Sequence, residues 1–380
     1  MPTILHTADV HLGRPWSGLE HCASRLADLQ WRSFERLADL ALEHEVAALV
    51  VAGDLFDRPG PEAALVEQVR GALRRLTDEG IAVVVAPGTH DAAASSRSVY
   101  RTDSLPAGVR TFLNPRLGER FVVERDGSAV AFQGLAWDPQ STPAAFLADF
   151  RRPDDGACEV LVVHGEVGSA RARRSQDLPA TAEELASAGA DYVALGHRHA
   201  FLELRLSGRL WGAYPGTPFG LSFREPELGT RRAALVTLEP GREPRVEPVS
   251  TTSVEWMRLP MDLAHFGSRQ ELVAAVAGSA GGERLALVEL SGAAAFPLAV
   301  EELEAELRGR FIHLAVEDAS VEVSAQVLER LSSEQSVRGI FARRMQARLA
   351  AARDEAQRAE LAEAVREGLR ALAEDGALRH

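Results

Sequence analysis

The sequence predicts an α/β protein, a layered αββα sandwich followed by a small α/β unit and a helical C-terminal tail. Three observations support this fold class. Over residues 1–250, short apolar runs alternate with segments whose apolar residues recur at helical spacing. Residues 239–244 then form a turn-rich break, and a shorter strand and helix pattern follows it. From Ala325 onward the pattern is helical.

Six apolar runs in the first part are too short for helices and have the composition of buried strands. Two longer segments, residues 24–44 and 62–76, instead space their leucine and valine side chains along one helical face. The expected strands cover residues 4–8, 47–52, 81–86, 129–135, 160–163 and 192–195.

The later part of the chain predicts a small βαβαβ unit and then helices. Its expected elements are strands at 254–261, 285–290 and 311–316, helices at 269–276 and 300–307, and an amphipathic helix at 347–374. The patterns divide the chain into regions 1–245, 250–320 and 325–380.

Composition narrows the class of protein. The net charge is −13, which argues against a nucleic-acid coat protein with a broad basic surface. Every basic residue is arginine, so phosphate contacts must come from Arg, His, metal or backbone N–H groups. No apolar run approaches the roughly 20 residues of a membrane span, and no signal peptide is expected. The two cysteines form no CxxC pair, and we expect a cytoplasmic protein.

Polar residues suited to metal binding follow five of the apolar runs. Ligands bind beyond the carboxyl ends of strands in such sheets, so we expect these groups to converge on one edge. Glycines flank them and permit close backbone approach. The groups are Asp9-Val10-His11, Gly53-Asp54-Leu55-Phe56-Asp57, Gly88-Thr89-His90-Asp91, His164-Gly165-Glu166 and Gly196-His197-Arg198-His199.

The donor types predict the metal. Imidazole and carboxylate without thiolate suit Mn²⁺, with Fe or Zn²⁺ as alternatives, better than Ca²⁺ or Cu(I). The donors are too many for one tetrahedral zinc but fit two adjacent ions. Two ions about 3.5–4 Å apart can clamp a phosphate ester and generate a hydroxide nucleophile.

These five groups resemble the signature of the calcineurin-like metallophosphoesterase family, in family order over residues 1–220. The resemblance implies a nuclease-type catalytic domain at 1–245, a capping domain at 250–320 and a helical C-terminal region at 325–380. It also implies the metal ligands: Asp9, His11 and His199 for the first ion, Asp54 as the bridge, and His164 and His197 for the second.

The resemblance assigns catalytic roles to three further residues. His90 would lie beside the scissile phosphate as an acid or transition-state stabiliser, and Asp91 would orient it. Asp57 would support the ligands or place the phosphate. Thr89 departs from the pattern, because the family usually has a metal-ligating Asn there and a hydroxyl is a poorer ligand. A water in its place, or a weakly bound second ion, follows from that change.

Finer resemblances point to the SbcD and YhaO-type branch of DNA repair exonucleases. Residues 4–13 and 213–218 resemble its motif segments, and residues 251–320 and 336–345 resemble its cap and helical tail. The implied partners are DNA, an SbcC-like or YhaN-like ATPase and a second copy in a homodimer, with no membrane. The basic group Arg171, Arg173 and Arg174 is either a DNA phosphate contact or a solvated loop.

Three hypotheses for the function follow. The first is a two-metal DNA phosphodiesterase, an exonuclease or endonuclease in which a metal-bound hydroxide attacks phosphorus and His90 assists. The second is a phosphoesterase for nucleotides or other small phosphoesters, which the extra cap and tail disfavour. The third, motivated by Thr89, is a weakly active scaffold for an ATPase partner.

Overall fold

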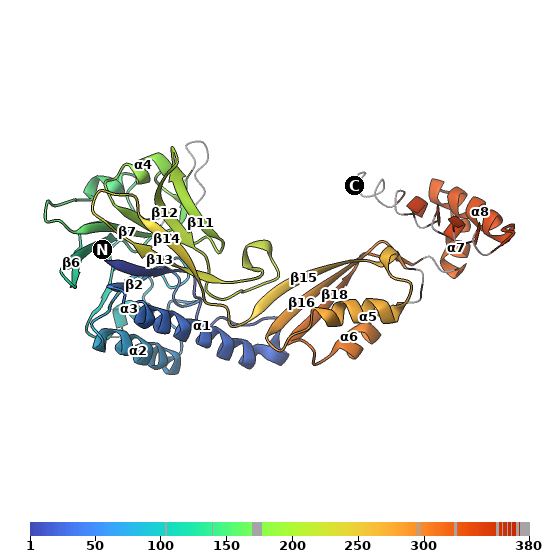
Figure 1. Ribbon diagram of the computed structural model, residues 1–380, viewed down its shortest axis with the longest axis horizontal. Coiled ribbons are helices and arrows are strands. Elements are labelled where there is room, and N and C mark those ends of the chain that lie inside the picture. The colour runs from blue at the N-terminus through green and yellow to red at the C-terminus, as the bar shows by residue number, and fades with distance from the viewer. Residues whose placement is uncertain are drawn as a thin grey trace. The chain divides into compact units, whose positions relative to one another are not determined.

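The chain divides into two compact units, Met1–Glu255 and Trp256–His380 (Figure 1). No helix in the described part of the chain is long and apolar enough to cross a bilayer. The computed structural model describes residues 1–102, 105–138, 140–168, 177–294, 296, 298–322, 325–354, 357–358, 360–362, 364–365, 367–369 and 372.

The first unit contains two six-stranded sheets. One has the order β14-β13-β1-β2-β3-β4 and the other the order β11-β12-β10-β7-β6-β5. The first comprises β1 (Thr3–Thr7), β2 (Ala48–Ala52), β3 (Ala82–Ala86), β4 (Val109–Thr111), β13 (Arg232–Thr237) and β14 (Arg245–Ser250). The second comprises β5 (Arg120–Arg125), β6 (Ser128–Gly134), β7 (Cys158–His164), β10 (Tyr192–Gly196), β11 (Phe201–Leu206) and β12 (Arg209–Pro215).

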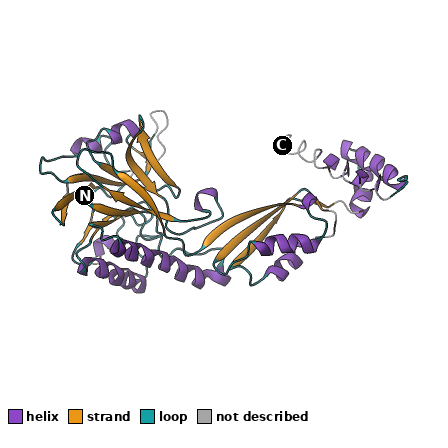
Figure 2. Cartoon of the chain, viewed as in Figure 1, coloured by secondary structure: helices purple, strands orange, loops and turns teal. Residues whose placement is uncertain are grey.

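Successive side chains of a buried strand belong to two different apolar layers, which explains why two sheets and two helix layers form. On β2, Leu49 and Val51 pack with the helices, whereas Val50 and Ala52 belong to the apolar layer between the sheets. Because side chains alternate across a strand, a run apolar at every position must be covered on both faces. The helices α1 (Ala23–Glu43) and α2 (Ala63–Asp78) cover the first sheet, as Figure 2 shows. The predicted layered α/β fold is thus confirmed.

Shorter elements complete the first unit. The outer face of the second sheet carries a further apolar cluster that includes Phe146, Leu185 and Trp211. The remaining elements are β8 (Glu166–Val167), β9 (Asp177–Leu178), α3 (Val99–Thr102), α4 (Ala182–Ala186) and the 3₁₀ turns η1 (Glu20–Cys22), η2 (Phe146–Asp149) and η3 (Glu225–Glu227).

The second unit contains the small α/β unit that the sequence predicts. Its sheet has the order β15-β16-β18, and β16 and β18 are parallel. An apolar cluster joins this sheet to two helices through Leu272, Val288 and Leu303. The elements are β15 (Glu255–Asp262), η4 (Leu263–His265), α5 (Arg269–Gly278), β16 (Arg284–Ser291), β17 (Ala293–Ala294), α6 (Val300–Leu307), β18 (His313–Asp318) and β19 (Val321–Glu322).

The C-terminal region is helical, with α7 (Ala325–Ser332) and α8 (Val337–Ala350) packed through Leu328, Leu331 and Met345. The predicted helix at 347–374 is not continuous, because α8 ends at Ala350 and residues 351–354 leave the helix. Asp354 Oδ1 accepts a hydrogen bond from Gln357 N at 2.7 Å, and Gln357 Oε1 accepts one from Arg353 N at 2.8 Å. A carboxylate that accepts from the backbone N–H three residues on is typical of a new helix start, which explains the interruption.

Candidate metal centre

All five predicted motif groups begin at or just beyond the carboxyl end of a strand. Three follow β1, β2 and β3 of the first sheet, and two follow β7 and β10 of the second. Backbone hydrogen bonds tie their loops together, from Asp9 N to Gly53 O at 3.0 Å and from Gly165 N to Gly196 O at 3.2 Å. The groups therefore converge as expected, but at an edge that two stacked sheets share rather than at the edge of one.

The loops at this edge carry backbone strain. Asp9, His11, Asp54 and His197 have φ values of 53°, 52°, 51° and 96°, in the left-handed region that side-chain-bearing residues rarely adopt. Such conformations cost about 1–3 kcal/mol each and persist where the surrounding structure enforces them, which is common at functional sites. Four of the predicted ligands are thus held in positions that the backbone alone disfavours.

Two glycines leave room for the ligands. A Cβ on Gly53, whose φ is +93°, would lie 2.0 Å from Nδ1 of His164. A Cβ on Gly88 would lie 2.3 Å from Oδ1 of Asp54. Any larger residue at either position would displace a ligand, which confirms the close approach expected of the flanking glycines.

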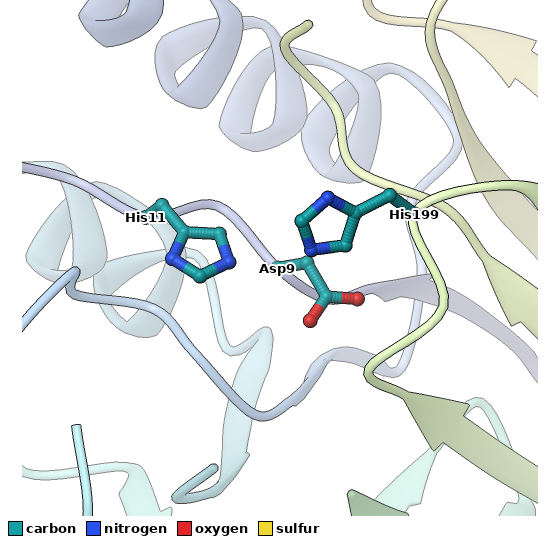
Figure 3. Close-up of side chains that lie close together, drawn as sticks. All are labelled: Asp9, His11 and His199. Carbon is teal, nitrogen blue, oxygen red and sulfur yellow. The ribbon is translucent and has the colours of Figure 1, made fainter. Parts of the chain in front are cut away.

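In the described part of the chain, three clusters of side chains have ligand atoms within 4.8 Å of one another. Figure 3 shows the first, in which His11 and His199 lie on either side of Asp9. Asp9 and Asp54 are almost completely buried, with 0% and 2% of their surface exposed. The clusters are Asp9 with His11 and His199, His11 with Asp57 and His90, and Asp9 with Asp54 and His164.

Hydrogen bonds orient the histidines of these clusters. Nδ1 of His11 lies 3.1 Å from Asp57 Oδ1, Nδ1 of His164 lies 2.9 Å from Ala52 O, and Nδ1 of His199 lies 2.8 Å from Glu227 Oε1. Because each Nδ1 faces an acceptor, the lone pair falls on Nε2. Among the described residues, the buried Nε2 atoms of His11 and His164 have no hydrogen-bond partner. These atoms fit a divalent cation, which would satisfy them.

The carboxylates of this centre attract positive charge, either a proton on the His164 ring or a divalent cation that displaces that proton. Burial opposes a charge on His164, yet Asp54 and Asp9 outweigh it and raise the pKa of His164 to about 10. Burial likewise opposes a charge on Asp54, but His164, His11 and His90 hold the pKa of Asp54 well below its usual range. Asp54 Oδ2 lies 3.3 Å from His164 Nε2 and 3.8 Å from His11 Nε2.

His197 is joined to the centre through its backbone, unlike the histidines described above, whose rings make the contacts. Its backbone N–H donates to both carboxylate oxygens of Asp9, at 3.1 and 3.0 Å. Its ring centroid lies 5.4 Å from that of His164. Burial and the neighbouring His164 lower the pKa of His197, which keeps the imidazole available as a ligand.

The expected pairing of Asp91 with His90 is wrong. Asp91 is fully buried and accepts hydrogen bonds from Gly88 N at 2.8 Å, Phe56 N at 3.2 Å and Tyr100 OH at 2.6 Å. Asp91 therefore holds the backbone at Gly88 and Phe56 in place rather than orienting His90. His90 instead faces Asp57, with Nδ1 3.3 Å from its carbonyl oxygen and 3.9 Å from its carboxylate.

The last predicted features are Thr89 and the basic group of Arg171, Arg173 and Arg174. Thr89 is half-buried between Gly88 and His90. Arg171, Arg173 and Arg174, the predicted DNA contacts, lie outside the described residues.

The comparison with known families decides the classification. Residues 2–201 match the model of the calcineurin-like phosphoesterases. The chain belongs to the calcineurin-like phosphoesterase family. The matched segment contains every ligand of the three clusters, so the metal centre lies in the part of the chain that defines this family.

Several known proteins resemble this phosphoesterase chain. The DNA double-strand break repair protein Mre11 of Aeropyrum pernix is 34% identical over 277 residues, which cover 70% of this chain and 65% of that protein. The uncharacterized metallophosphoesterase YhaO of Bacillus subtilis is 25% identical, covering 52% of this chain and 48% of that protein. The SbcD component of the nuclease SbcCD of Escherichia coli K12 is 27% identical, covering 70% and 73%. The chain thus spans less than two thirds of the length of the first two relatives.

Sequence patterns missed the residues that support this phosphoesterase centre. Glu227 is buried, and besides His199 it accepts a hydrogen bond from Leu221 N. Arg231 donates to the carbonyl oxygens of His199 at 2.5 Å and Thr217 at 3.1 Å. Gln30 donates to those of Val10 and His11 at 2.8 and 2.9 Å. These residues lie far from the motifs in sequence. The sequence signal that could have indicated such a supporting role is a polar residue on an apolar helix face, as at Gln30.

Proposed function

We propose that this chain is a two-metal DNA phosphodiesterase of DNA repair. One observation carries the proposal: Asp9, His11, Asp54, His164 and His199 gather around buried imidazole nitrogens that have no hydrogen-bond partner among the described residues. The names of the relatives, a double-strand break repair protein and a nuclease component, support DNA as the substrate.

The metal assignments are those that the family resemblance implies, and the cluster of Asp9, His11 and His199 supports the first of them. Asp9, His11 and His199 would hold one ion, His164 and His197 the other, and Asp54 would bridge them. Two bound divalent ions supply an activated water and neutralise charge on the phosphate. The carboxylate and imidazole donors suit Mn²⁺, with Fe or Zn²⁺ as alternatives. Thr89 would leave the second ion more weakly held than an Asn would.

His90 would act on the substrate. It is the most accessible side chain of the clusters, with 48% of its side chain exposed, and its ring lies 4.6 Å from that of His11. With Nδ1–H directed at the Asp57 carbonyl, Nε2 lies away from that contact, and the doubly protonated ring would donate a proton from Nε2 to the leaving oxygen. Asp57 thereby positions both His90 and His11.

The remaining regions would serve DNA and partner binding. We assign residues 1–245 as the nuclease domain, 250–320 as the capping domain and 325–380 as the helical region. Val337 and Ile340 of α8 are exposed to 69% and 48%, which supports docking of an SbcC-like or YhaN-like ATPase. A homodimer and a cytoplasmic location are further parts of the proposal.

The deciding experiment compares Mn²⁺-dependent hydrolysis of DNA and of nucleotides by the parent, His90→Ala, Thr89→Asn and a control, His44→Ala, whose side chain is exposed. We expect DNA cleavage that falls by about 10²–10⁴ in His90→Ala and persists in the control. Turnover of nucleotides alone would favour the small-substrate alternative. No turnover by parent or Thr89→Asn, with ATPase binding intact, would favour the scaffold.

A further inference from the structure

Two arginines, Arg14 and Arg198, lie beside the metal centre. The fold orients their guanidinium groups, but these groups form only loose ion pairs among the described residues. Arg14 Nη1 lies 3.6 Å from Asp57 Oδ1, and Arg198 Nη1 lies 3.4 Å from Glu166 Oε1. These distances exceed those of well-formed hydrogen bonds. Within the described residues, neither side chain donates a hydrogen bond, so the N–H groups of both remain available.

Each guanidinium lies over a buried aromatic ring. Arg14 is 5.8 Å from the ring centroid of Trp16, and Arg198 is 5.8 Å from that of Tyr214. Hydrogen bonds at Tyr214 OH, to Gly165 O at 3.1 Å and from Val167 N at 3.0 Å, hold that ring against the segment after His164. Stacking on a ring restricts an arginine without consuming its donors, which suits it for recognising a planar or tetrahedral anion.

Two other arginines of the first unit, Arg231 and Arg120, differ from this pair. Arg231 is 5% exposed and donates to carbonyl oxygens from three of its nitrogens. Arg120 pairs with both Glu159 and Asp155. Arg14 and Arg198, by contrast, keep 33% and 44% of their side chains exposed, so a ligand from solvent can reach them.

The position of the pair relates it to the metal ligands. Arg14 approaches Asp57, which belongs to the cluster of His11 and His90. Arg198 lies between His197 and His199 in the chain, and its acidic partner Glu166 follows His164. One cation therefore stands beside each of two ligand-bearing loops.

We propose that Arg14 and Arg198 bind the phosphates that flank the scissile phosphate, so that the centre accepts a polynucleotide strand rather than an ester with a single phosphate. The proposal rests on the phosphodiesterase function proposed above and deepens it by naming the substrate class. A phosphate at each guanidinium would replace the loose contact with Asp57 or Glu166 by charge-assisted hydrogen bonds.

The test compares two substrates that differ in the number of phosphates. A single-stranded DNA oligonucleotide offers flanking phosphates, whereas bis(p-nitrophenyl) phosphate offers only the scissile one. Parent, Arg14→Gln, Arg198→Gln and the double variant are assayed with Mn²⁺ at several salt concentrations. Arg75→Gln is the matched control, because Arg75 is 48% exposed and pairs with Asp39 on the helices that cover the first sheet.

We expect each Gln variant to raise KM for the oligonucleotide by about tenfold or more. The slope of log KM against log salt should fall by about 0.7 for each arginine removed. Hydrolysis of the single-phosphate diester should keep its KM and kcat, and Arg75→Gln should match the parent on both substrates. Arg14→Lys and Arg198→Lys should retain the salt slope, since lysine keeps the charge.

The possible failures are distinguishable. If the parent cleaves DNA and the Gln variants show the parent KM and salt slope, the flanking-phosphate role is wrong and the proposed function stands. Equal losses on both substrates would also overturn the role, because they would place the arginines at the scissile phosphate or at the metals. A parent that hydrolyses only the diester would overturn the proposed DNA function, and this inference with it.

Discussion

The same strand supplies one histidine to the interior of the sandwich and, through the loop after it, another to the metal centre. His6 of β1 is fully buried between the sheets, where Nδ1 lies 2.9 Å from Tyr192 OH and burial lowers its pKa to about 3. His11 is equally enclosed, at 2% exposed, but lies 3.8 Å from Asp54 and 3.1 Å from Asp57. Burial alone therefore does not distinguish a packing histidine from a ligand.

The two regions differ in how their polar groups are neutralised. In the interior, a neutral imidazole contacts a phenol through Nδ1 among apolar side chains. At the edge, carboxylates and imidazoles crowd together on strained backbone, which a divalent cation would stabilise. The interior pair thus carries no charge, whereas the edge gathers carboxylates and imidazoles whose charge a cation would balance.

The largest expected effect comes from filling the space that glycine leaves at the edge. Gly53→Ala should lower the free energy of unfolding by about 3 kcal/mol, because it combines left-handed strain with overlap onto His164. The control is Gly127→Ala, whose φ is +73° but whose Cβ would meet nothing within 4 Å. Urea unfolding measures both variants. Equal losses would show that the close packing at Gly53 contributes nothing beyond backbone strain.

Adding Mn²⁺ should stabilise the folded protein through the metal centre at the shared edge of the two sheets. At a free concentration 100 times the dissociation constant, the ion should raise the free energy of unfolding by about 2.7 kcal/mol, because it binds the folded state alone. Differential scanning calorimetry measures the effect as a higher Tm. His11→Ala should lose it and the exposed His44→Ala should keep it. A Tm that does not respond to Mn²⁺ in the parent would contradict a metal-dependent edge.

Acid should weaken the interior through His6. Its folded pKa of about 3 lies below the unfolded value, so the unfolded chain binds the extra proton as pH falls below about 6.5, and stability is lost. Between pH 7 and pH 5 the loss from this group is about 2 kcal/mol. His6→Gln cannot titrate, so its unfolding free energy should depend less on pH than that of the parent. Parallel pH profiles would contradict the assignment.

The smallest expected effect concerns the support of a single ligand. Glu227→Gln replaces the carboxylate that faces His199 Nδ1 and should weaken Mn²⁺ binding by about tenfold. Isothermal titration calorimetry measures this directly. Glu225→Gln, an exposed acid in the same 3₁₀ turn, should bind Mn²⁺ like the parent. Unchanged affinity in Glu227→Gln would mean that Glu227 only holds the loop.

The middle of the first sheet was predictable because local signals encode its strands and the helices that cover it. The strands at β1, β2 and β3 and the helices α1 and α2 each carry a complete periodic pattern within one segment. The antiparallel strands β5, β11 and β14 mix half-buried with exposed residues and were not predicted. Their pairing depends on partners elsewhere in the chain, which a local pattern does not reveal.

The candidate centre shows the same division. Asp9, His11, Asp54, His164 and His199 were predictable, since each follows an apolar strand in a short motif. The supporting contacts were not, because Glu227 lies 28 residues from His199 and Asp91 turns away from its neighbour His90 toward Tyr100. Which side chain meets which carboxylate depends on loop geometry that the motif spacing does not contain.

The amino-acid sequence by itself determined the donor types, their place after the strands and the α/β class, because these follow from local periodicity and residue chemistry. Only the tertiary structure decided that two stacked sheets bring the donors to one shared edge. Among the described residues, it also left Nε2 of His11 and His164 without a hydrogen-bond partner and Arg14 and Arg198 in loose ion pairs. Those outcomes depend on distances between segments far apart in the chain, which folding alone sets.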